Sequence, residues 1–195
     1  MNMDAVQKKE RIIIDVDGVL RDYVASLNIV YHREYPEHDI LPVTDWALEH
    51  FYPLGKGIYD FIDTRFADEI LENAPAYPGA ITALHDWEDR FEIVIATSQP
   101  PAHRYPTLVW LGKHRVPANE VHITYEKQRL SGFALLDDYP VNLRKFEATG
   151  RLAVCMDQPW NRDYTGPRVK SVGEFFAYLT VYLEDLDSES DYLLA

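Results

Sequence analysis

The chain has 195 residues, of which 47% are hydrophobic, and a formal net charge of −13 at pH 7. This length fits one domain, or one domain with a sizeable insertion, and it is enough to bury a core. The negative charge excludes a general nucleic-acid surface, which needs a basic footprint, so an anionic ligand would have to be held locally by metal, amides and a few cations.

At the N-terminus, Met1 to Arg11 contain no apolar stretch long enough for a signal peptide, and no later run could span a bilayer. We therefore expect a cytoplasmic protein without a membrane partner. The first predicted strand is Arg11 to Val16. Its three consecutive isoleucines favour a strand that is covered on both faces. In open α/β sheets, strands of this kind deliver their carboxyl ends to active sites.

Asp15 and Asp17 close this strand and Gly18 follows at once. If the strand period of two persists, both carboxylates lie on one side of the backbone and their charges converge. A cation or a shared proton would relieve the repulsion, and hard oxygen ligands favour magnesium. A solvated turn or the start of a calcium loop would also fit Asp-x-Asp-Gly, but Val19 to Val24 lack the acidic positions of a calcium loop.

About sixty residues, Arg21 to Tyr77, separate this strand from the next helix, far more than an ordinary crossover connection contains. They hold aromatic and helix-forming patterns at Tyr23 to Tyr35 and Ile58 to Leu71. We predict a small helical cap, residues 21–77, inserted after strand one. Residues 1–20 and 78–195 would then form the core.

After the insertion, apolar strand-like runs alternate with helical patterns, which predicts parallel strands joined by right-handed crossovers. The fold class is therefore α/β with a parallel sheet. The predicted strands are Phe91 to Thr97, Val121 to Thr124, Phe133 to Asp137 and Leu152 to Met156. The predicted helices are Gly79 to Asp89, Arg104 to His114, Val141 to Thr149 and Val172 to about Leu186, and the acidic end, Glu184 to Asp191, is predicted to be a solvated tail.

The last of these strands carries Cys155, the only cysteine of the chain. A single cysteine excludes an internal disulfide and suits a reducing compartment. Its apolar surroundings favour a core thiol over a reactive one.

Polar side chains follow three of the later strands. Thr97 and Ser98 end strand two, and their hydroxyls and following amides suit phosphoryl oxygens, although they would equally suit the cap of the next helix. Lys127 follows strand three as a point cation for a phosphate, unless it is merely solvated. Asp137 and Asp138 end strand four and offer more carboxylate for a metal.

This series resembles the four motifs of the haloacid dehalogenase (HAD) superfamily of phosphatases. Within it, the closer resemblance is to the 5'(3')-deoxyribonucleotidase family. The matching segments are Asp15 to Leu20, Thr97 to Pro100, Thr124 to Lys127, Leu135 to Asp138 and, in a late loop, Gln158 to Asn161. Two residues depart from the pattern: Gln99 displaces a proline by one position, and Arg21 stands where many relatives have a small residue.

The resemblance implies a Rossmann-like core with a helical cap and a Mg²⁺-dependent phosphomonoester hydrolase. Asp15 would be the nucleophile that forms an aspartyl-phosphate, and Asp17 would act first as general acid and then as general base. Magnesium would be held by Asp15, by the backbone carbonyl of Asp17 and by a carboxylate of Asp137 or Asp138, which the sequence does not distinguish.

The resemblance further implies that Thr97, Ser98 and Lys127 cradle the transferring phosphoryl group. It favours a nucleoside monophosphate as substrate, specifically a 5'- or 3'-deoxyribonucleotide. Another small phosphorylated metabolite, or a non-catalytic nucleotide-binding protein on the same fold, are the alternatives. A dehalogenase fits less well because it needs neither a metal nor an acid at the position of Asp17.

Substrate choice is expected to lie in the cap. Trp46, Phe51, Tyr52 and Tyr59 offer planar surfaces on which a nucleobase could stack. Alternatively, these aromatic residues simply build the core of the cap. A homodimer is compatible with the sequence, but no feature of the chain specifies one.

Overall fold

The computed structural model describes residues 9–193; residues 1–8, which include most of the stretch considered for a leader, lie outside it. Six parallel strands form one sheet in the order β3-β2-β1-β4-β5-β6. The parallel α/β fold class is thereby confirmed. The strands are β1 (Glu10–Ile14), β2 (Phe91–Thr97), β3 (Glu120–Ile123), β4 (Ala134–Asp137), β5 (Leu152–Met156) and β6 (Arg168–Val169).

Helices cover both faces of the sheet. Ile12 and Ile14 of β1 belong to a hydrophobic cluster that contains residues of α4 and α7, whereas Ile13 belongs to another cluster with residues of α6. All three isoleucines are fully buried, as expected for a strand covered on both faces. The helices of this part are α4 (Ala80–Trp87), α5 (Pro101–Lys113), α6 (Pro140–Glu147) and α7 (Val172–Leu193).

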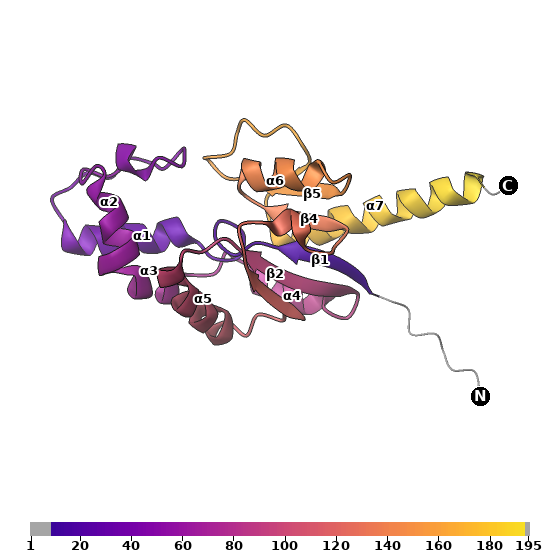
Figure 1. The fold of residues 1–195 in the computed structure, drawn as a ribbon, viewed down its shortest axis with the longest axis horizontal. Helices are drawn as coiled ribbons and strands as arrows, with labels where there is room; N and C mark the ends of the chain where they lie inside the picture. The colour runs from indigo at the N-terminus through magenta and orange to yellow at the C-terminus, as the bar shows by residue number, and fades with distance from the viewer. Residues whose placement is uncertain (1–8, 194–195) are drawn as a thin grey trace.

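The insertion between β1 and α4 lies at one end of the sheet (Figure 1). It contains α1 (Tyr23–Glu34), a 3₁₀ turn (Leu48–His50), α2 (Gly57–Asp60), a π-helical turn (Phe61–Arg65) and α3 (Ala67–Asn73). Ten of its residues form a separate buried hydrophobic cluster.

The chain enters and leaves the insertion at adjacent points. Asp22 N–H donates to the Pro75 carbonyl at 2.9 Å, and Tyr77 N–H donates to the Leu20 carbonyl at 2.8 Å. Two short connections therefore join the insertion to the sheet. The division into a 21–77 cap and a core stays a prediction.

Some element boundaries differ from those predicted. Strand β1 ends at Ile14 rather than Val16, because the carbonyl of Val16 accepts hydrogen bonds from a tight turn that follows. Strand β6 was not predicted; it is only two residues long. Helix α7 continues through the acidic segment to Leu193 because neither Gly nor Pro follows Gly173, so the segment that was predicted to be a solvated tail is helical.

Candidate active site

The candidate site lies where the strand order reverses. After β1 the chain builds β2 and β3 on one side, and it then crosses to β4 on the other side of β1. Loops that diverge at such a switch point leave a crevice at the carboxyl ends of the strands. Asp15 follows β1 here, Asp137 ends β4, and Asp138 follows it.

Asp15, Asp137 and Asp138 form a buried carboxylate cluster, in which one oxygen of each lies within 4.8 Å of the others. Lys127 Nζ contacts Asp15 Oδ1 at 2.8 Å and Asp137 Oδ2 at 2.6 Å. Burial raises the pKa of Asp15 to about 7 even though Lys127 acts against the shift. Burial, together with the charges of Asp137 and Asp15, also raises the pKa of Asp138. The single positive charge of Lys127 therefore does not balance the three carboxylates of the cluster.

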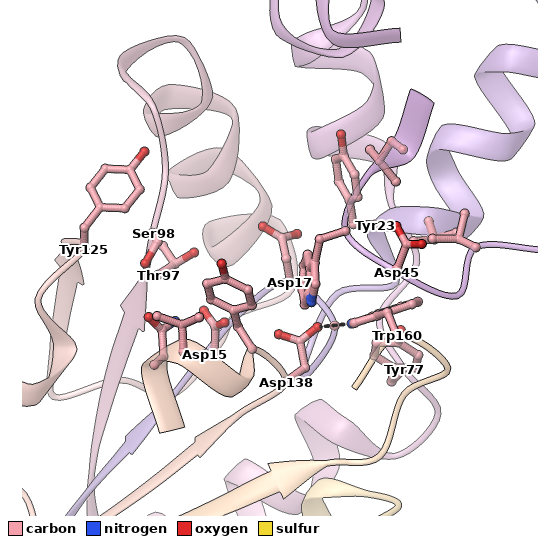
Figure 2. A pocket seen from close by; sticks show the side chains of 18 of the residues that line it. Asp15, Asp17, Tyr23, Asp45, Tyr77, Thr97, Ser98, Tyr125, Asp138 and Trp160 are labelled. Carbon is pink, nitrogen blue, oxygen red and sulfur yellow. Dashed lines mark hydrogen bonds between the residues drawn. The ribbon is translucent and has the colours of Figure 1, made fainter. Parts of the chain in front are cut away.

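The two aspartates of β4 have different environments. Asp137 is fully buried, and its carboxylate accepts hydrogen bonds from Lys127, from the Tyr139 N–H at 2.8 Å and from Asn142 Nδ2 at 3.0 Å. Asp138 lines the pocket, and Trp160 Nε1 donates to its Oδ2 at 2.8 Å, the bond drawn in Figure 2. Asp138 is therefore the carboxylate of this pair that remains available to a ligand.

Gly18 makes the close approach of the β1 and β4 loops possible. Its φ is +74°, and a Cβ atom at this position would lie 1.9 Å from Asp138 Oδ2. Only glycine satisfies both the backbone conformation and the space. The Gly18 carbonyl accepts a hydrogen bond from Gln158 Nε2 at 2.7 Å, which ties the late loop to the same turn.

Asp17 lies apart from the carboxylate cluster. The prediction that Asp15 and Asp17 converge through the strand period is wrong, because β1 ends at Ile14 and the turn redirects Asp17. Its carboxylate binds Arg21 and Gln99 instead, while its side chain remains 29% exposed and lines the pocket. Within residues 9–193, the Asp17 carboxylate is not a member of the acidic cluster.

The predicted phosphate-binding residues gather around Asp15. Thr97 and Ser98 line the pocket, and Ser98 Oγ donates to the Thr124 carbonyl at 3.0 Å. The alternative that Thr97 or Ser98 caps α5 is wrong, since the N-cap is Pro100 and no side chain caps it. Lys127 is 1% exposed and is not among the pocket-lining residues, so it acts directly on Asp15. Its contact with phosphate stays a prediction.

A pocket of about 490 Å³ opens above these residues, between the sheet and the insertion. Figure 2 shows Asp15, Asp138 and Thr97 on the sheet side and Tyr23 and Asp45 of the insertion on the other. The lining is mostly apolar and aromatic, which suits a ligand with a planar part beside a polar one.

Of the cap residues predicted to bind substrate, Trp46 alone lines the pocket. Its ring lies 4.7 Å from that of Tyr139 and 5.9 Å from that of Trp160. The prediction that Phe51 and Tyr52 bind the substrate is wrong, because both are buried in the hydrophobic cluster of the insertion and neither lines the pocket. The alternative that aromatic residues build the cap core holds for these two.

Sequence reasoning missed several pocket residues. They are aromatic residues from separate parts of the chain together with one acidic and one basic residue: Tyr23, Tyr77, Tyr125, Tyr139, Asp45 and Lys145. No local pattern distinguishes them from surface residues. The resemblance of the late loop, Gln158 to Asn161, to the family did indicate a part of the site. Trp160 Nε1 donates to the Asp138 carboxylate, and Asn161 Nδ2 donates to the Asp138 carbonyl at 2.8 Å.

The donor set fits a hard divalent cation. Three buried carboxylates with one lysine form an arrangement whose repulsion a cation would relieve, and oxygen ligands suit Mg²⁺. Oδ1 of Asp138 has no hydrogen-bond partner within residues 9–193, and neither has Oδ2 of Asp15. These two oxygens of the cluster are therefore free to contact a bound cation or substrate.

Comparison with known proteins identifies several similar sequences. Residues 9–181 match the family model described as 5' nucleotidase, deoxy (pyrimidine), cytosolic type C protein. The cytosolic-type 5'(3')-deoxyribonucleotidase of Homo sapiens is 25% identical over 140 residues, which cover 66% of this chain and 70% of that protein. The mitochondrial 5'(3')-deoxyribonucleotidase of Mus musculus is 23% identical over 142 residues, which cover 67% and 64%. The chain thus spans about two thirds of the length of these relatives.

Solved structures share the fold at low sequence identity. A haloacid dehalogenase-like hydrolase from Streptococcus pneumoniae has a TM-score of 0.61 at 13% identity, covering 88% of this chain and 98% of its own. A HAD hydrolase from Bacillus subtilis bound to magnesium has a TM-score of 0.59 at 13% identity, covering 89% and 100%. None of the helices within residues 9–193 combines the length and the hydropathy that crossing a bilayer requires.

Proposed function

The chain belongs to the 5' nucleotidase, deoxy (pyrimidine), cytosolic type C protein family, and from this membership we propose that it is a Mg²⁺-dependent 5'(3')-deoxyribonucleotidase that acts through an aspartyl-phosphate on Asp15. The observation that carries the proposal is the position of Asp15. It lies in the pocket beside Lys127 and opposite Asp138, with one carboxylate oxygen free of hydrogen bonds among residues 9–193.

In the proposed reaction, the free oxygen of Asp15 attacks phosphorus, and the bond from phosphorus to the nucleoside oxygen breaks. Lys127 and the Val16 N–H, which lie 2.8 and 2.7 Å from the other oxygen of Asp15, orient the nucleophile. Thr97 and Ser98 lie beside it in the pocket and would contact the phosphoryl oxygens.

Asp17 would give a proton to the departing nucleoside oxygen and would later take one from the water that hydrolyses the aspartyl-phosphate. Its exposure to the pocket supports this role. Asp15, Asp138 and the backbone carbonyl of Asp17 would hold Mg²⁺, while Asp137 would keep Lys127 in place. When bound, the ion would supply positive charge that neutralises the attacking and leaving oxygens.

The pocket supports a nucleotide as the substrate. Its aromatic lining includes Trp46, Tyr139 and Trp160, which present planar surfaces above the carboxylates. The homologues of human and mouse are named as deoxyribonucleotidases, which agrees with a deoxyribonucleoside monophosphate. A phosphatase of another small metabolite is the second candidate. The cytoplasmic location and a homodimer stay predictions.

The test is phosphate release from deoxyribonucleoside monophosphates, ribonucleoside monophosphates and sugar phosphates, with Mg²⁺ and with a chelator. We expect metal-dependent release that is fastest on the deoxyribonucleotides and is lost in Asp15→Asn. Asp89→Asn is the matched control, because this exposed carboxylate precedes β2 at the other end of the sheet. Release from sugar phosphates alone would refute the substrate assignment and keep the mechanism. Nucleotide binding without release from any compound would refute the enzymatic assignment.

A further inference from the structure

Arg21 is a fully buried arginine that binds Asp17. Its Nε donates to Asp17 Oδ1 at 2.7 Å, and its Nη2 donates to Oδ2 at 2.9 Å. Such a bidentate pair fixes the plane of the carboxylate as well as its position. Arg21 itself does not line the pocket, so it neither reaches the phosphate nor meets the negative surface.

The guanidinium of Arg21 is in turn held from both sides. Nη1 donates to the Leu71 carbonyl of α3 at 3.2 Å, and Nη2 donates to Thr107 Oγ1 of α5 at 3.1 Å. The Trp110 ring centroid lies 5.4 Å from Arg21 Cζ. The chain enters the insertion at Arg21, whose backbone forms isolated β-bridges with Asp17 and with Ala76. Its position therefore depends on contacts with both the sheet layer and the insertion.

Gln99 approaches Asp17 from a different loop. It is 4% exposed, it follows β2, and its Nε2 donates to Asp17 Oδ2 and, at 3.2 Å, to Thr97 Oγ1. Both oxygens of Asp17 are thus bonded, by three donors on two side chains. Arg21 and Gln99 are also the two residues at which the motifs depart from the pattern of the family they resemble.

We propose that Arg21 and Gln99 are positioning residues that hold the Asp17 carboxylate at the point from which it exchanges a proton with the leaving group. This inference rests on the proposed function, in which Asp17 is the acid and base. Three donors leave one orientation of the carboxylate in the pocket. Without them the side chain rotates freely, and misplacing a reacting group by about 1 Å can cost about 100-fold in rate.

The test compares two leaving groups. A nucleoside leaves as an alkoxide and requires a proton, whereas 4-nitrophenolate is a weak base and leaves without one. In Arg21→Met and Gln99→Leu we expect kcat on a deoxyribonucleoside monophosphate to fall about 10- to 100-fold, with KM changing less than about threefold. The pre-steady-state burst of 4-nitrophenolate, which reports transfer to Asp15 alone, should fall less than about threefold.

A second variant and a control variant complete this test. Within residues 9–193 no hydrogen bond joins the Gln99 side chain to the insertion, so Gln99→Leu tests the proposal even if Arg21→Met does not fold, and circular dichroism establishes folding. Arg11→Met is the matched control, because Arg11 forms a bidentate pair with Glu120 near the opposite end of β1. It should change both rates less than about twofold. Equal losses on both substrates in Gln99→Leu would overturn the proposal.

Asp17→Asn separates the inference from the proposed function. If Asp17 is the acid, this variant alone should lose nucleotide turnover and keep the 4-nitrophenolate burst. If Arg21 and Gln99 act through Asp17, adding either substitution to Asp17→Asn should leave the burst rate unchanged within about twofold. A further tenfold loss in the double variants would overturn the positioning role. An equal loss of both substrates in Asp17→Asn would instead refute the acid role.

Discussion

The different environments of Asp137 and Asp138 predict opposite effects on stability and on metal binding. Asp137 is the buried partner of Lys127, and Asp137→Asn leaves that lysine with Asp15 alone. Removing one partner of a buried ion pair costs about 3–5 kcal/mol, and the lower end applies because the second partner remains. A loss of about 3 kcal/mol lowers the melting temperature by about 6–12 °C in a domain of this size.

Asp138→Asn should behave differently. The amide oxygen can still accept the hydrogen bond from Trp160, and the substitution removes a carboxylate whose pKa is raised by burial and by two neighbouring aspartates. In chelator, we therefore expect no loss of stability. The stabilisation by Mg²⁺ should disappear, however, which in the wild type is about 2.7 kcal/mol at 100 times the dissociation constant.

The assay is thermal unfolding followed by circular dichroism, in chelator and in excess Mg²⁺, for both variants and for the control Asp89→Asn. Asp137→Asn should melt lower in chelator and keep the rise with Mg²⁺. Asp138→Asn should melt as high as the wild type in chelator and show no rise. The reverse pattern, in which Asp137→Asn alone loses the response to Mg²⁺, would refute the division of roles read from the hydrogen bonds.

Gly18→Ala should destabilise the fold by about 1–3 kcal/mol in urea unfolding and lower kcat, because φ is +74° and the new Cβ would meet Asp138; unchanged values would contradict this. Burial raises the Asp15 pKa from 3.8 to about 7, so the native state binds the proton more tightly than the unfolded state does. In chelator the free energy of unfolding should therefore fall as pH rises from about 4 to about 7, and an equal slope in Asp15→Asn would count against this. Trp46→Ala should raise KM for a nucleotide about three- to tenfold and leave inhibition by inorganic phosphate unchanged, since Trp46 packs on Tyr139 above the carboxylates; a matching change in phosphate inhibition would exclude a base-binding role.

Local patterns were sufficient to predict the core of the fold. The bounds of β2 and β5 match the prediction, and the deoxyribonucleotidase family that the motifs indicated is confirmed by the family match. Buried parallel strands are continuous apolar runs whose ends are marked by polar residues, so their limits can be read within a few positions.

The insertion was less predictable. Its aromatic residues carry no sign of whether they face the pocket or the interior, and Phe51 and Tyr52 are buried whereas Trp46 reaches Tyr139. The predicted helix Ile58 to Leu71 is in fact two α-helices separated by a π-helical turn. Such choices depend on packing against the rest of the chain, which overrides local propensity.

The sequence by itself determined the parallel sheet, the order of the motifs and the presence of four aspartates at strand ends, because these depend on residues close together in the chain. Only the tertiary structure decided what each aspartate does. Asp138 faces the pocket, Asp137 holds Lys127, and Asp17 binds Arg21 and Gln99, which lies 82 positions away. Contacts at that separation are set by the strand order, which no local pattern encodes.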